Sequence, residues 1–203
     1  MAVLPSLATV ADLAMLLGRS FTPEQEQQAQ ALLDQASSVV RAYIRQDITR
    51  ATTTDAFTLR RVDPLRYGCV GAVTLPQRPV EEVTLVEVDG VATADWWLDG
   101  SELLVRGWSW DLPPAAHQPP RVAVTYTHGW DPVPGDIQAI VMQAANRVLV
   151  NPRQIRSEAV GGESVTYLIP ATGEALGVLL SKVEMRVLDR YRRTSGTIRV
   201  RSG

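Results

Sequence analysis

The chain has 203 residues, of which 45% are hydrophobic and 21% charged, and its formal net charge is −2. These values are typical of a globular protein with one domain or a compact two-part domain and a sizeable core. The small net charge argues against nucleic acid or an anionic membrane as the main partner of the whole surface, and no window approaches the roughly 18 consecutive apolar residues of a membrane span.

Two helices are predicted at the start of the chain. Thr9 is a suitable N-cap for the first helix, and Gly18 is a suitable stop. The run Thr22-Pro23-Glu24-Gln25 combines a capping box with a proline at the first helical position. Apolar residues then recur at helical spacing from Ala29 to Ile44, which predicts a long amphipathic second helix.

Residues 51–130 change to a period of two, with β-branched and aromatic residues between turn signals. This pattern predicts an inserted antiparallel β region. Asp89-Gly90 and Asp99-Gly100 are typical of tight hairpin turns. The predicted strands are Asp55 to Val62, Cys69 to Leu75, Val83 to Val88, Trp96 to Leu98, Leu103 to Val105 and Arg121 to Thr127.

Helical periodicity returns after Pro134 and ends at Asn151-Pro152, which predicts a third main helix. Residues 153–170 contain Gly161-Gly162 and an alternating run, which predicts a projecting hairpin or an extended arm. The run Ser181-Lys182-Val183-Glu184 is another capping box and predicts a last helix that continues to Arg193. Residues 173–180 are either an earlier turn of that helix or a loop.

The expected fold class is therefore α+β, a small helical bundle with an antiparallel β region inserted between the second and third main helices. The bundle comprises residues 1–50 and 131–193, the insert residues 51–130, and a tail residues 194–203. Between Lys182 and Arg201 the sequence contains seven basic residues and two acidic ones, so this end of the chain is basic. In the tail Ile198 and Val200 alternate with Arg199 and Arg201, and two interpretations stay open: a strand added to a partner's sheet edge, or a frayed terminus.

No catalytic or cofactor motif stands out in the sequence. Cys69 is alone, which excludes an intrachain disulfide and a cysteine-based zinc site. His128, with Asp136 nearby in sequence, could be drawn as a base and its orienting carboxylate, but no serine elbow supplies a nucleophile. The alternative is a histidine at a strand-to-helix turn. We expect no catalytic residues, no metal site and no cofactor, and the start of the chain lacks a signal peptide, which predicts a cytoplasmic product.

The order and spacing of several segments are similar to those of the head-to-tail adaptor family of long-tailed bacteriophages, also called head-tail connector or head-completion proteins. The similarity spans nearly the whole chain. The segments that carry it are Ala8 to Leu13, Ala36 to Ile44, Arg78-Pro79-Val80 with Val88-Asp89-Gly90, Val124 to Gly129 with Pro134 and Asp136-Ile137, Val160 to Tyr167, and Leu188 to Arg193.

This resemblance implies a structural protein of the virion neck, not an enzyme. Copies would form a ring, with the portal's twelvefold symmetry, that docks under the portal, extends the DNA channel without specific DNA binding and presents a platform for the next neck or tail-completion protein. The expected portal contacts are Arg192, Arg193, Ile198, Arg199, Val200 and Arg201. The expected contacts with a neighbouring subunit or another neck protein are Gly161, Gly162, Val165 and Tyr167.

Three other functions remain in competition. Another neck or tail-completion protein, such as a stopper or a tail terminator, is the nearest, although the opening helices argue against those mainly β proteins. A hydrolase centred on His128 is the enzymatic alternative. A DNA-binding module is the third, and it would need a basic surface outside the tail.

Overall fold

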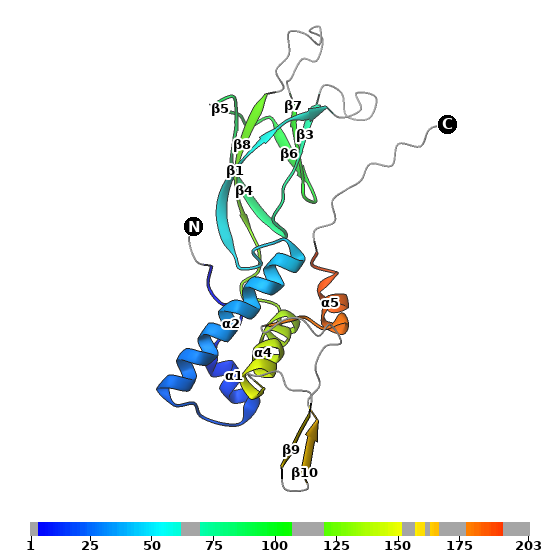
Figure 1. Cartoon of the computed structure of the whole chain (residues 1–203). Coiled ribbons are helices and arrows are strands. Elements are labelled where there is room, and N and C mark those ends of the chain that lie inside the picture. The colour runs from blue at the N-terminus through cyan, green and yellow to red at the C-terminus, as the bar shows by residue number, and fades with distance from the viewer. Residues whose placement is uncertain are drawn as a thin grey trace, which may run out of the picture. The chain divides into compact units, whose positions relative to one another are not determined.

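The computed structural model describes residues 4–61, 70–106, 120–151, 157–160, 163–166 and 178–192. The chain forms two compact units: unit 1 is Met1–Gln46 with Val133–Gly203, and unit 2 is Asp47–Pro132. The described residues contain four helices and two four-stranded antiparallel sheets, which confirms the α+β class (Figure 1). The β unit is inserted in the sequence between α2 and α4, as predicted.

Three helices of unit 1 begin where the capping residues predict, and α4 begins after Pro134 without a side-chain cap. Thr9, Thr22 and Ser181 each form a full capping box, in which the hydroxyl accepts from the third helical N–H and the third side chain bonds back. These boxes satisfy helix N–H groups that otherwise have no partner. The helices are α1 Val10–Leu17, α2 Pro23–Ile44, α4 Gly135–Val150 and α5 Lys182–Leu188.

The core of unit 1 is formed by the apolar faces of these helices. Ser37 lies within it and is satisfied locally, because its hydroxyl donates to the Leu33 carbonyl at 2.7 Å and accepts from the Leu7 N–H at 2.9 Å. Burial of these faces is the main stabilising contribution to the helices, since isolated short helices are marginal in water. The fully buried apolar residues include Leu13, Leu33, Val40, Ile44, Ile137, Val141 and Leu188.

Unit 2 contains two sheets with strand orders β1-β8-β4-β5 and β2-β3-β7-β6. Side chains from both sheets form one apolar core around Val86, Val124 and Tyr126. The Tyr126 hydroxyl donates to the Asp55 carboxylate at 2.8 Å, which satisfies the polar end of a fully buried ring. The strands are β1 Ala51–Thr58, β2 Arg60–Arg61, β3 Val70–Thr74, β4 Val80–Val88, β5 Val91–Ala92, β6 Trp96–Asp99, β7 Glu102–Arg106 and β8 Arg121–His128.

Of the two predicted turn pairs, Asp89-Gly90 has the expected left-handed backbone, whereas Asp99 ends β6 and the second turn is formed by Gly100 and Ser101. Asp89 and Gly90 both have positive φ, 48° and 82°, and Gly100 has a φ of 61°. The first pair connects β4 to β5, a two-residue strand that the sequence analysis did not anticipate. Positive φ at both central residues matches the right-handed twist of the flanking strands, which is why Asp-Gly is favoured there.

Several predicted boundaries are wrong, among them the strand predicted to start at Val83, which starts at Val80, and the first strand, which ends at Thr58 instead of Val62. The last helix ends at Leu188 instead of Arg193, because residues 189–192 form a turn in which the N–H groups of Tyr191 and Arg192 bond to carbonyls three residues earlier. The first strand begins at Ala51, four residues before the predicted start, because its threonines pair with those of β8. The predicted strand from Cys69 to Leu75 corresponds to β3, which covers Val70–Thr74.

The segment after α4 contains a hairpin. Strands β9 Ser157–Val160 and β10 Glu163–Thr166 pair antiparallel, and the Gly161-Gly162 pair connects them in sequence. Of the two predictions for residues 153–170, the hairpin therefore agrees with the described part. The remainder of that segment, including Gly161, Gly162 and Tyr167, lies outside the described residues.

Candidate functional site

The last described segment, α5 with the turn up to Arg192, is held by polar contacts at both ends. Its N-terminal anchor is Glu184, which is only 6% exposed. Both Glu184 oxygens accept from the Arg147 guanidinium on α4, at 2.7 and 3.0 Å. The same guanidinium donates to the Leu179 carbonyl at 2.8 Å, so one side chain fixes both the helix and the segment that leads into it.

Glu184 also completes the capping box of α5. Its carboxylate accepts from the Ser181 N–H at 2.7 Å while the Ser181 hydroxyl accepts from the Glu184 N–H at 3.2 Å. Burial by itself would raise the pKa of Glu184, but the hydrogen bonds from Arg147 and the Ser181 N–H outweigh it and hold that pKa below its usual value. The carboxylate is therefore a charged, fully bonded anchor.

The C-terminal anchor ties the turn after α5 to α2. The Tyr43 hydroxyl donates to the Asp189 carboxylate at 2.6 Å, and this hydrogen bond is the main reason why the pKa of Tyr43 is raised. The Gln46 amide donates to the Tyr191 carbonyl. The Arg192 guanidinium lies over the Tyr43 ring, 5.2 Å from its centroid. The last described residue of the chain is thus in direct contact with α2.

A third set of contacts ties the same turn to α4. Asp136, in the first turn of α4, accepts from the Tyr191 hydroxyl at 2.9 Å and pairs with the Arg190 guanidinium. Arg190 also lies over the Tyr191 ring, 4.7 Å from its centroid. Residues 189–192 are therefore fixed to two helices. The basic tail begins from this fixed point.

Of the predicted portal contacts, the structure describes Arg192, which is exposed and contacts Tyr43. Val165 lies in β10, where its backbone pairs with Glu158. The other predicted site residues lie outside the described part of the chain: Arg193, Ile198, Arg199, Val200, Arg201, Gly161, Gly162 and Tyr167.

The anchors of α5 were not singled out by sequence reasoning. Arg147 and Glu184 are 37 residues apart, and Tyr43 and Asp189 are 146 apart. The capping box identified Glu184 as a local partner of Ser181, but no local signal identifies its second partner. Only the folded arrangement of α2, α4 and α5 brings these residues together.

His128, the centre of the enzymatic alternative, is fully buried at the end of β8. Among the described residues neither ring nitrogen has a hydrogen-bond partner, and the ring centroid lies 5.3 Å from that of Tyr126. Burial lowers the pKa of His128 against the opposing pull of Asp47 and Asp55. Asp136, the carboxylate proposed to orient it, instead bonds to Arg190 and Tyr191.

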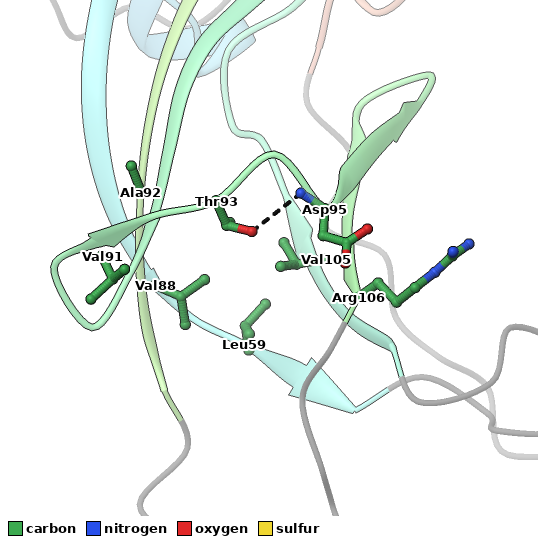
Figure 2. A pocket seen from close by; sticks show the side chains of 8 residues that line it. All are labelled: Leu59, Val88, Val91, Ala92, Thr93, Asp95, Val105 and Arg106. Atoms are coloured by element: carbon green, nitrogen blue, oxygen red, sulfur yellow. Dashed lines mark hydrogen bonds between the residues drawn. The ribbon is translucent and has the colours of Figure 1, made fainter.

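A pocket of about 320 Å³ lies between the ends of the two sheets of unit 2 (Figure 2). Most of its wall is apolar, with Asp95 and Arg106 as its charged residues. The Thr93 hydroxyl accepts from the Asp95 N–H at 3.2 Å, and Arg106 stacks over the Trp97 ring at 5.4 Å. The lining residues are Leu59, Val88, Val91, Ala92, Thr93, Asp95, Val105 and Arg106. This wall can accept an apolar side chain, but it does not combine a nucleophile with a base.

Within the described residues, no three histidine, cysteine, aspartate or glutamate side chains come together as a group that could hold a metal ion. None of the described helices is long and apolar enough to cross a membrane.

Comparison with known proteins gives a fold match without a sequence match. No protein-family model matches the chain, and no curated protein sequence matches it. Two solved structures are similar over almost the full length: a chain in the neck of an empty gene transfer agent particle, computed with C6 symmetry, and a chain in the virion of a native gene transfer agent particle. Each has a TM-score of 0.55 and 20% sequence identity, with 97% of this chain and 96% of the other covered. At this identity the chain shares the fold of these two particle proteins.

Proposed function

We propose that this chain is a structural subunit of the neck of a phage-like particle. The observation that carries the proposal is the similarity in fold to a chain of a gene transfer agent neck, which covers 97% of this chain and 96% of the other. A match over both full lengths includes the helical unit, the β unit and their order in the chain. A fold by itself does not define a function, so the proposal depends on the assembly tests below.

Within the neck, we propose the role of head-to-tail adaptor. Copies form a ring of twelve under the portal protein, extend the DNA channel and present a platform for the next neck or tail-completion protein. A ring of twelve copies is compatible with sixfold symmetry, which is the symmetry with which the similar neck was computed. The net charge of −2 suits a channel through which DNA passes without specific binding. The subunit is made in the host cytoplasm and ends in the virion, and its role requires no catalysis.

The C-terminal segment is the proposed portal contact, through Arg192, Arg193, Ile198, Arg199, Val200 and Arg201. The anchoring of residues 189–192 to α2 and α4 supports this role, because a peptide that starts from a rigid point loses less entropy on docking. The alternating Ile198 and Val200 suit a strand added to a partner's sheet edge, with the arginines on the opposite side.

The hairpin formed by β9 and β10 is the proposed contact with a neighbouring subunit or with the next neck protein. The proposed contact residues in and beside it are Gly161, Gly162, Val165 and Tyr167. A two-stranded hairpin is marginally stable alone, so a third strand or a packing surface from a partner would stabilise it. In the described residues its two strands pair only with each other.

Electron microscopy of the purified chain mixed with isolated portal rings, or with tailless heads from the same source, tests the proposal. The expected result is a closed ring on the portal. A chain that remains apart from intact portals would overturn the adaptor role. A ring located at the far end of an already completed neck would instead favour a stopper or a tail terminator.

A pull-down with portal-filled heads tests the docking segment. Deletion of residues 194–203 is expected to leave a folded protein that no longer joins heads. Replacement of Ile198 and Val200 by serine, with the arginines retained, separates strand addition from charge attraction. Retained binding by the deleted protein would exclude the tail as the portal contact.

A further inference from the structure

The outer surface of the sheet β1-β8-β4-β5 has an unusual composition for a solvent-exposed face. On β8 the side chains of Val122, Val124 and Tyr126 point into the core, so the alternate residues lie on the outer face. The registers of β1, β4 and β5 place their own outer residues beside these. This Thr/Ala face consists of Thr52, Thr54, Ala56, Thr58, Leu85, Ala92, Ala123 and Thr125, with Glu82, Glu87 and Arg121 as its charged residues. Thr127 continues it on β8 but is only 7% exposed.

A partner that covers the Thr/Ala face would remove water from few unpaired polar groups, so the free-energy cost of dehydration is small. Two pairs of threonines bond to each other across the strands: Thr52 to Thr127 at 2.9 Å and Thr54 to Thr125 at 2.8 Å. These four hydroxyls therefore already have protein partners, and burying them does not leave them unpaired. Leu85, 41% exposed, is the large apolar side chain of the face. On β1 and β8 the one charged residue of the face is Arg121, at its end, and Glu82 and Glu87 lie beside these strands on β4. An uncharged area with charged residues next to it has the composition of an interface core and its rim.

The outer face of α5 has the complementary composition. Glu184 and Leu188 are buried, and Lys182, Val183, Arg186 and Val187 are exposed on the opposite side of the helix. Lys182 lies next to Arg186 and Val183 next to Val187, because each pair is four residues apart, and the two pairs lie side by side on the exposed side of α5. Val183 is 69% exposed and Val187 38%. In the described part of the chain Lys182 and Arg186 take part in no ion pair.

We propose that the Thr/Ala face of one copy receives the outer face of α5 from an adjacent copy of the same chain. Val183 and Val187 would pack on the threonine methyls and Leu85, and Lys182 and Arg186 would lie opposite Glu82 and Glu87. We choose a second copy as the partner because the two surfaces carry opposite net charge. Residues 47–132 carry twelve acidic and seven basic side chains. Residues 182–192 carry four basic and two acidic side chains, and the two acidic ones, Glu184 and Asp189, already have hydrogen-bond partners.

This contact joins two different surfaces, so repeating it produces a closed ring or an open array. The inference thus rests on the proposed ring and specifies the surfaces that build it. A seven-residue helix covers far less area than the roughly 800 Å² per partner of a stable interface. A single contact is therefore weak, and many copies gathered on a portal would stabilise each other through repeated contacts.

Charge reversal tests the pairing. R186E and E82R are each expected to raise the concentration for half-maximal ring formation on portals by about tenfold or more. The double variant R186E/E82R, and an equimolar mixture of the two single variants, should restore rings because each interface again joins opposite charges. E26R, an exposed reversal in the first turn of α2, is the matched control and should assemble like the unmodified chain. Normal assembly of both single variants, or no rescue by the double variant, would overturn the proposal.

Disulfide formation tests the contact independently of ring formation on portals. Two variants are prepared with different tags: V183C/C69S and L85C/C69S. They are mixed at high concentration and oxidised. A mixed-tag disulfide is expected, and L85C mixed with M15C, whose residue is 81% exposed in the parent, is the control. Rings on portals without the mixed disulfide would overturn this inference and leave the adaptor role intact. A mixed disulfide in chains that do not bind portals would support the contact and overturn the adaptor role.

Discussion

Removal of the Arg147 guanidinium is the most direct test of how α5 is anchored. In R147L the Glu184 carboxylate stays buried but loses both charged hydrogen bonds, and the Leu179 carbonyl loses its donor. Breaking a buried ion pair from one side costs about 3–5 kcal/mol. The Arg147 side chain is 32% exposed, so water compensates in part, and we expect about 2–3 kcal/mol.

This loss should appear first as local opening of α5, because the helix has few buried apolar residues of its own. Hydrogen exchange read by mass spectrometry on peptides covering residues 182–188 should therefore accelerate about 30-fold or more, since 1.4 kcal/mol corresponds to a factor of ten. R19L is the matched control, because Arg19 is exposed and lies over the Phe21 ring.

A double variant separates the effect of the lost ion pair on stability from the effect of the changed side-chain shape. Glu184→Gln keeps an oxygen for the capping box but removes the charge, so R147L/E184Q should be less destabilised than R147L alone. The pKa of Glu184 is lowered by folding, so its contribution is present above the ordinary carboxyl pKa and is lost as the pH falls through the folded value. Unchanged exchange of α5 in R147L would refute the reasoning.

Three further outcomes are expected. Y43F should lose the hydrogen bond to Asp189, seen as faster tryptic cleavage after residues 190 and 192, and an unchanged cleavage rate would contradict it. G129A should destabilise unit 2 by more than about 3 kcal/mol in denaturant titration, because a Cβ there would lie 2.5 Å from a backbone carbonyl oxygen at a φ of 92°. G90A, with open space around it, should cost only about 1 kcal/mol, and equal effects would argue against the clash. Folding lowers the pKa of His128, so the free energy of unfolding should fall as the pH drops from about 6.5 towards the pKa of His128 in the folded protein. H128F should abolish this pH dependence, which thermal melts at several pH values would measure.

The helix starts were predictable from sequence because each depends on three or four neighbouring residues. The box from Thr22 to Gln25, for example, is complete within the first turn of α2. The end of α5 was not predictable, since Asp189 and Tyr191 leave the helix to bond with residues of α2 and α4 far away in the chain. Local propensity favours continuation, and tertiary contacts override it.

The start of β1 shows the same limit for strands. Residues 51–54 lack the large apolar side chains that mark a strand by alternation, and the threonine pairs with β8 that hold them in the sheet are 71 and 75 residues apart in sequence. The candidate site was predictable only as a basic end of the chain. Its anchors depend on contacts that no local pattern records.

The entry and exit of unit 2 are joined to each other. The Trp130 N–H donates to the Ile48 carbonyl at 2.8 Å, the Arg50 N–H donates to the Trp130 carbonyl at 3.1 Å, and Gly129 packs against the same backbone. An insert whose two ends lie side by side can be gained, lost or exchanged through a single pair of junctions, without rethreading the helices that flank it in sequence. Unit 2 is therefore a replaceable insert, and chains of this fold can differ in it while keeping the same helices.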